Sequence, residues 1–107
     1  MLFYIQMKWN IDGRITLDEM WDLQLKEVEA VKNSISVVAM YKVAVQRRVI
    51  CIADFPSADE LDEALLGRLP LADYLEFEAV WPLRPFDDFI EDCKTHFRPV
   101  HSAAVGG

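Results

Sequence analysis

The stretch LFYIQMKWNIDGRITLDE, residues 2–19, predicts a strand that is followed closely by a helix. Large apolar side chains occupy every second position over residues 2–9, and a period of two is typical of a strand. Turn-forming residues fill positions 10–13. Thr16 and Glu19 then match a capping box, in which the Thr16 hydroxyl accepts from the Glu19 amide and the Glu19 carboxylate reaches back. A helix is therefore expected directly after Thr16.

The following segments complete one β-α-β unit and begin another. Apolar residues at helical spacing predict a helix over residues 17–33. Residues 36–45 and 48–54 are rich in β-branched residues, which predicts two strands. Only Gln46 and Arg47 lie between these strands, so we expect a hairpin. The stripe of the first helix comprises Leu17, Met20, Trp21, Gln24, Val28 and Val31.

The second half of the chain repeats this logic. Ser57 is the expected N-cap of a second helix, with Glu60 as its capping-box partner. Gly67 is the expected C-cap of that helix. Alternating residues over 74–81 predict a fourth strand. The order of elements is therefore β-α-β followed by β-α-β.

Two such units predict an α+β fold of the ferredoxin-like βαββαβ kind, a four-stranded antiparallel sheet with both helices on one face. Pro82 and Pro85 are expected to end the last strand, and the apolar residues beyond them predict an extra C-terminal helix. We expect one domain over residues 1–97, followed by a tail over residues 98–107.

The composition bears on partners. Hydrophobic residues make up 52% of the 107-residue chain, which predicts either a dense core or apolar surface kept for another subunit. The sheet face away from the helices would also carry apolar side chains, including Leu2, Tyr4 and Tyr74. Both observations favour a homo-oligomer, a dimer at least.

The net charge of −7 argues against a nucleic-acid partner and against an anionic membrane surface, since both bind mainly through Lys and Arg. No apolar run approaches the roughly 20 residues that span a bilayer. Cys51 and Cys93 have no ligand-like spacing, so we expect reduced thiols, no metal site and a cytoplasmic protein.

Three blocks of sequence carry a resemblance to a known family. They are MLFYIQM at residues 1–7, DFPSADEL at 54–61 and LPLADYLEFE at 69–78. In these blocks the chain resembles the muconolactone Δ-isomerases. The resemblance implies a subunit of the dimeric α+β barrel type, which can build a larger ring such as a decamer. It also implies an isomerase of aromatic catabolism that moves a proton and a double bond in a small unsaturated lactone, without cofactor or metal.

The chain departs from the family pattern in two places. Residues after 81 differ from the best-known catabolic members, and Gln46 stands where we associate a His with those members. These departures leave two alternatives open. One is a non-catalytic protein that binds a small molecule, and the other is a different cofactor-free enzyme, such as a cyclase, on the same scaffold.

Lactone isomerisation requires a base near neutral pH, a donor for the developing enolate oxygen and a cation for the substrate carboxylate. Glu27, on the first helix, is the expected base, because the family carries an acidic residue that aligns there. The alternative for Glu27 is an exposed position in a charged surface run. Glu76 and Glu78 are further candidates if a partner sheet encloses them, and otherwise they would form interface ion pairs.

The remaining site candidates lie in or near the hairpin. Lys42, Arg47 or Arg48 could bind the substrate carboxylate, and the alternative is a solvated hairpin tip. Tyr41 or Gln46 could donate to the carbonyl oxygen, and the alternatives are sheet packing for Tyr41 and a plain turn role for Gln46.

Overall fold

The computed structural model describes residues 1–98, so most of the predicted tail lies outside the described residues. In chain order the elements are β1 (Leu2–Trp9), α1 (Leu17–Ser34), β2 (Ser36–Lys42), β3 (Arg48–Asp54), α2 (Ala58–Glu63), the π-helical segment η1 (Ala64–Arg68), the 3-10 turn η2 (Ala72–Tyr74), β4 (Leu75–Leu83) and α3 (Phe86–Lys94).

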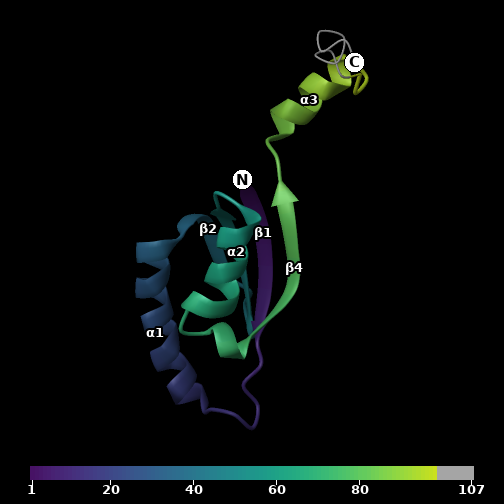
Figure 1. Cartoon of the computed structure of the whole chain (residues 1–107). Helices are drawn as coiled ribbons and strands as arrows, with labels where there is room; N and C mark the ends of the chain where they lie inside the picture. Colours follow the sequence, from purple (N-terminus) through teal and green to yellow (C-terminus); the bar gives the residue numbers. More distant parts are fainter. Residues whose placement is uncertain (99–107) are drawn as a thin grey trace.

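The strands form one antiparallel sheet in the order β2-β3-β1-β4. Figure 1 shows α1 and α2 on the same side of this sheet, with α3 beyond the end of β4. The predicted α+β architecture, with a ferredoxin-like order of elements and an extra C-terminal helix, is therefore confirmed. The two outer strands are β2 and β4, and no element of residues 1–98 covers the face opposite the helices, called the uncovered face below.

Helix starts follow the predicted caps. The Thr16 hydroxyl accepts from the Glu19 amide at 3.1 Å, and the Glu19 carboxylate accepts from the Thr16 amide at 3.0 Å. Such a reciprocal cap satisfies two backbone donors at the helix start. The Ser57 hydroxyl likewise accepts from the Glu60 amide at 3.1 Å, whereas the Glu60 carboxylate accepts from Arg68. The second cap is therefore one-sided.

Two predicted boundaries were wrong. The strand expected over residues 36–45 ends at Lys42, because Val45 has a φ of 70°, a left-handed conformation that cannot continue a strand. The loop between the strands therefore has five residues. Gly67 is not a C-cap, since the helical backbone continues as η1 to Arg68 before the chain becomes extended.

The last strand also differs from expectation. It continues through Pro82 to Leu83, which is tolerated because β4 is an edge strand and one side needs no ladder donor. A bulge shifts the β1–β4 register between Gln6 and Met7. Beyond it, Trp81 pairs with Tyr4 and stacks on its ring at 5.1 Å. Trp81 thus lies on the uncovered face, not on the helix face that simple alternation predicts.

The core lies between the sheet and the two helices. Alternate residues of β1 are buried on the helix side. The buried residues form two clusters. The larger comprises Phe3, Ile5, Met7, Cys51, Ala53, Phe55, Ala64, Leu65 and Leu69, and the smaller comprises Trp9, Ile11, Met20 and Leu71.

The C-terminal helix α3 makes a different kind of surface. None of its residues, all within the described part of the chain, is buried. Phe89 has Phe86 and Phe97 on either side, with ring centroids 5.5 Å and 5.8 Å away. Figure 1 shows this helix away from α1 and α2. Within one chain, therefore, its aromatic residues remain largely exposed to solvent.

Candidate functional site

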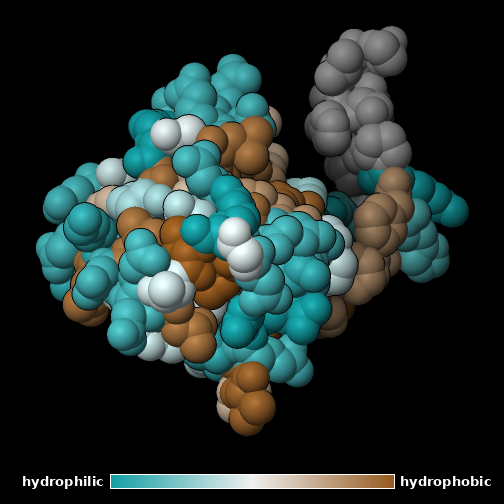
Figure 2. Space-filling model, turned by 90° about the horizontal axis from the view of Figure 1, so that it is seen from below, coloured by the Kyte–Doolittle hydropathy of each residue, from teal (hydrophilic) through white to brown (hydrophobic). Residues whose placement is uncertain are grey.

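A cavity of about 280 Å³ lies between α1 and the helix-facing side of the sheet. Its walls are almost entirely apolar. Most of the lining comes from α1, from strands β1, β2 and β3, and from the segment around η1. Figure 2 shows hydrophobic residues exposed between hydrophilic ones on the face seen from below. The polar or ionisable side chains that line the cavity are Gln24, Glu27, Lys32 and Cys51.

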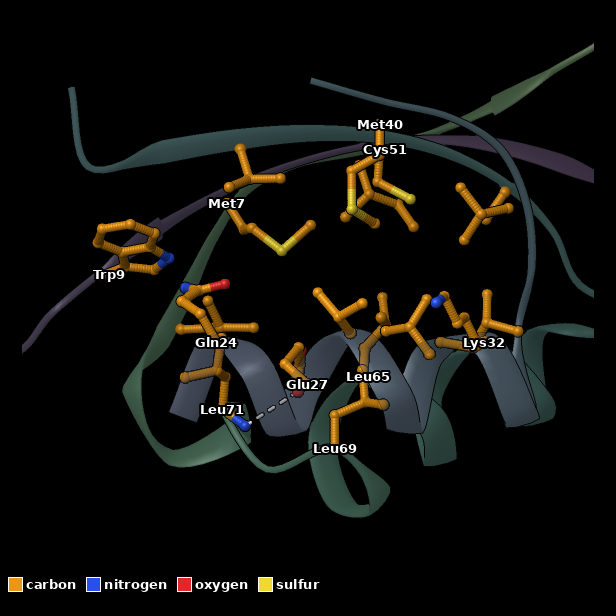
Figure 3. Close-up of a pocket in the computed structure, with 18 of the residues that line it drawn as sticks. Met7, Trp9, Gln24, Glu27, Lys32, Met40, Cys51, Leu65, Leu69 and Leu71 are labelled. Atoms are coloured by element: carbon orange, nitrogen blue, oxygen red, sulfur yellow. Dashed lines mark hydrogen bonds between the residues drawn. The ribbon is translucent and has the colours of Figure 1, made fainter. Parts of the chain in front are cut away.

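Glu27 is the only carboxylate that lines this cavity within residues 1–98. Its Oε1 accepts a hydrogen bond from the backbone N–H of Leu71 at 3.2 Å (Figure 3). Partial burial raises the pKa of the Glu27 carboxyl, and the Leu71 bond offsets part of this rise. A carboxylate with a raised pKa in an apolar cavity is a stronger base than an exposed one.

The position of Glu27 follows from the spacing along α1. Residues three and four apart share one helix face, so Gln24, Glu27, Val28 and Val31 all face the sheet. The Leu71 amide comes from the short turn between η1 and η2, 44 residues away in the chain. The helical spacing is a local property of α1, whereas the hydrogen bond from Leu71 depends on the packing of both β-α-β units.

Gln24 and Lys32 line the cavity although sequence reasoning did not select them. The Gln24 amide donates to the Met20 sulfur at 3.6 Å, and the Lys32 ammonium lies 3.8 Å from the carboxylate of Glu29. The sequence could have identified Gln24, because a polar residue in the apolar stripe of the first helix is expected to face the sheet. Lys32 is in the last turn, where a lysine ordinarily complements the helix dipole.

Cys51 contributes a neutral group. Its side chain is buried on β3, and burial raises the pKa of the thiol to about 11. The thiol therefore stays protonated at neutral pH.

Lys42 lies on the helix-facing side of the sheet, beside the cavity. It pairs with Val49, which pairs in turn with the buried Met7. The Lys42 ammonium lies 5.8 Å from the ring centroid of Trp9, a cavity-lining residue, and donates to the carbonyl of Val43 at 2.7 Å. Of the three predicted cations, Lys42 is thus the one beside the cavity.

The uncovered sheet face holds a separate polar network. Arg48 forks onto Glu78, with Nε–Oε1 at 2.8 Å and a second bond to Oε2 at 2.9 Å, and it also donates to Gln46 at 3.0 Å. Gln6 donates to Glu78 at 3.1 Å and accepts from Tyr4 at 2.9 Å. The hydrogen bond from Arg48, together with that from Gln6, lowers the pKa of Glu78 to about 2.

Two further predicted residues also lie away from Glu27. Tyr41 pairs with Ile50, which pairs with Gln6, so Tyr41 belongs to the uncovered face. Arg47 is in the loop after β2 and pairs with Asp12 at 2.9 Å. Within one chain, the structure therefore does not bring Tyr41, Gln46, Arg47 or Arg48 to the cavity that contains Glu27.

No group of three or more His, Cys, Asp or Glu side chains within residues 1–98 is placed to hold a metal ion. Nor do these residues include a helix that is long and apolar enough to cross a bilayer.

A comparison with known protein families gives a match that covers most of the chain. The sequence profile of muconolactone delta-isomerase matches residues 1–88 of the 107-residue chain. The chain belongs to the muconolactone delta-isomerase family. A comparison with curated proteins gives no significant match. Family membership thus supports a function related to small-molecule isomerisation, and the match ends within α3.

Proposed function

We propose that this protein is a cofactor-free isomerase that moves a proton and a double bond in muconolactone or a similar small unsaturated lactone. The observation that carries the proposal is the half-buried carboxylate of Glu27 in an otherwise apolar cavity, in a chain of this family. A non-catalytic binding pocket has no need for a titratable group whose ionised form is disfavoured by burial.

The proposed reaction uses Glu27 twice. Its carboxylate removes a carbon-bound proton that is acidified by conjugation with the lactone carbonyl, and the C–H electron pair moves toward the carbonyl oxygen. The protonated Glu27 then delivers the same proton to another carbon of the resulting enolate, which restores the carbonyl and shifts the double bond. The net change is an isomerisation, so neither an oxidant nor a reductant is consumed.

The apolar walls favour this chemistry in two ways. They destabilise the free carboxylate of Glu27, which increases its basicity toward a weakly acidic carbon. They also keep bulk water from the enolate, which strengthens every hydrogen bond made to its oxygen. The Leu71 amide limits the rise in pKa and holds the carboxylate in place.

The test is an ultraviolet assay for loss of muconolactone with the parent chain, Glu27→Gln and Asp22→Asn. Glu27→Gln should lower kcat by roughly 10²–10⁴-fold, the usual contribution of a general base. Asp22 is an exposed carboxylate on the same helix that does not line the cavity, so Asp22→Asn is the matched control and should retain activity. A folded parent chain that leaves muconolactone unchanged, or full activity of Glu27→Gln, would contradict the proposal.

We also propose that the chain is a homo-oligomer, a dimer or a ring of dimers. Support comes from the uncovered sheet face, where Trp81 is 58% exposed, and from α3, where Phe86 is 70% exposed. Large apolar patches of this kind are ordinarily covered by another chain.

We also propose a cytoplasmic location, because the thiols of Cys51 and Cys93 are free.

Sedimentation at micromolar concentration tests the assembly. The parent should sediment as a multiple of 12.3 kDa, and the double variant Phe86→Ser, Phe89→Ser should shift toward smaller species. Asp87→Ser, on the same helix, is the control. A parent that sediments as a single 12.3 kDa species would exclude the oligomer.

A further inference from the structure

Three polar side chains of one helix line the cavity, and they are spaced along its axis. Gln24 is three residues before Glu27, and Lys32 is five residues after it. At about 1.5 Å per residue, these steps correspond to about 4.5 Å and 7.5 Å along the helix. Figure 3 shows Gln24 and Trp9 toward one end of the cavity, Lys32 toward the other, and Glu27 between them along α1.

Gln24 is suited to donate to an anionic oxygen. Its amide donates to the Met20 sulfur at 3.6 Å, and a thioether is a weak acceptor. Exchange of this bond for one to an enolate oxygen is favourable, because hydrogen bonds to charged acceptors are the stronger kind. The sheet side of α1 at this position is apolar, which removes competing acceptors.

Lys32 is suited to hold a carboxylate at the edge of the cavity. It is the only cationic side chain that lines the cavity within the described residues. Its ion pair with Glu29 is long, at 3.8 Å, and both partners are about 70% exposed, with values of 67% and 72%. Such a surface pair contributes little, so an incoming substrate carboxylate can displace it readily.

We propose that α1 orients the substrate, with Gln24 as the donor to the enolate oxygen and Lys32 as the anchor of the substrate carboxylate. The inference rests on the proposed function and assigns two further residues of the same cavity, one to the lactone carbonyl and one to the substrate carboxylate. The lactone carbonyl then faces the Trp9 end of the cavity, and the carboxylate faces the C-terminal end of α1.

The test of the anchor compares muconolactone with its methyl ester. Lys32→Met should raise KM for the acid roughly 10-fold, as expected for loss of a partly exposed charge-assisted bond, with kcat nearly unchanged. The same change should leave KM for the uncharged ester unaltered. Lys26→Met is the matched control, because Lys26 is an exposed lysine of α1 that does not line the cavity. Lys32→Arg should restore part of the affinity.

The test of the donor uses Gln24→Met, which keeps the length of the side chain and removes its N–H groups. It should lower kcat roughly 10²-fold with little change in KM, as expected for loss of one oxyanion donor. Circular dichroism and thermal melting of each variant establish that the fold is retained. A folded Gln24→Met variant that has parental kcat would overturn the donor role.

Failure of this inference is separable from failure of the proposed function. A parent chain without activity on muconolactone overturns both. The isomerase function stands if the parent is active and Glu27→Gln is not. If, in that case, Lys32→Met has the same KM values as the parent for the acid and for the ester, the proposed orientation along α1 is overturned.

Discussion

The cavity beneath α1 and the uncovered face of the sheet each hold a glutamate, and the two glutamates have opposite surroundings. Glu27 faces apolar walls and accepts one backbone N–H, so burial raises its pKa. Glu78 accepts a two-pronged bond from Arg48 and another from Gln6, so its pKa is lowered to about 2. Burial therefore brings the pKa of Glu27 toward the range that the proposed base needs, whereas Glu78 stays ionised at neutral pH.

The comparison explains why the carboxylate of Glu27 is suited to proton transfer and that of Glu78 to a structural ion pair. A base must exchange its proton near neutral pH, whereas an ion pair is most useful when its charge does not change. Glu78 was a reasonable candidate base from the sequence, on the condition that a partner sheet enclosed it. Its pairing with Arg48 makes it a poor base, because the proton affinity of an anion falls when a guanidinium binds it.

The largest expected effect concerns turnover. Glu78→Gln should leave kcat on muconolactone nearly unchanged, against the loss of roughly 10²–10⁴-fold expected for Glu27→Gln. Steady-state kinetics of the two isosteric variants under one set of conditions measures the difference. Comparable losses in both variants would remove the functional distinction between the two glutamates.

The second prediction contrasts neighbouring residues on the two sheet faces. Ile5 is 1% exposed in the larger core cluster, and Ile5→Ala should lower the free energy of unfolding by about 2–5 kcal/mol. Gln6→Ala, on the uncovered face, removes the hydrogen bonds that Gln6 makes with Glu78 and Tyr4, and it should cost only about 1 kcal/mol because water can replace these bonds. Urea denaturation of both variants at equal protein concentration gives the comparison, which equal costs would refute.

The third prediction concerns the pH dependence of activity. The proposed base Glu27 must be ionised to accept a proton, so kcat/KM should fall as the pH is lowered through its pKa. Because burial raises that pKa, the midpoint of the acid limb should lie above the ordinary value for a glutamate. A pH–rate profile on muconolactone tests this. A midpoint at or below the ordinary glutamate value would indicate that the cavity does not raise the pKa of the base.

The smallest expected effect is on the pH dependence of the free energy of unfolding. The sign of this effect differs between the two glutamates. The pKa of Glu27 is raised by folding, so its ionisation destabilises the fold as pH rises through that pKa. Relative to the parent, Glu27→Gln should therefore gain stability toward neutral pH. The pKa of Glu78 is lowered, so its charge stabilises the fold above the ordinary glutamate pKa, and this contribution is lost as pH falls toward 2.

The measurement is the unfolding free energy of parent, Glu27→Gln and Glu78→Gln at several pH values between 3 and 8. Glu78→Gln should be less stable than the parent near neutral pH and should approach it in acid. Curves of the same sign for both variants would show that the two environments do not differ as described.

Local features of the chain were sufficient to predict most of the fold. The capping box at Thr16 and Glu19 places the start of α1, and the period of two over residues 2–9 places β1. These signals act between residues that are close in sequence, so their physics does not depend on the rest of the chain. Glu27, by contrast, was selected through the family resemblance, and its sheet-facing position is known from the structure.

Register, pairing and the walls of the cavity were decided only by the tertiary structure. The bulge between Gln6 and Met7 moves Trp81 to the uncovered face, and no local sequence pattern predicts this bulge. The pairing of Arg48 with Glu78 and the bond from Leu71 to Glu27 each join distant parts of the chain. Such contacts depend on how strands align and helices dock, and these arrangements are determined by the packing of the whole core.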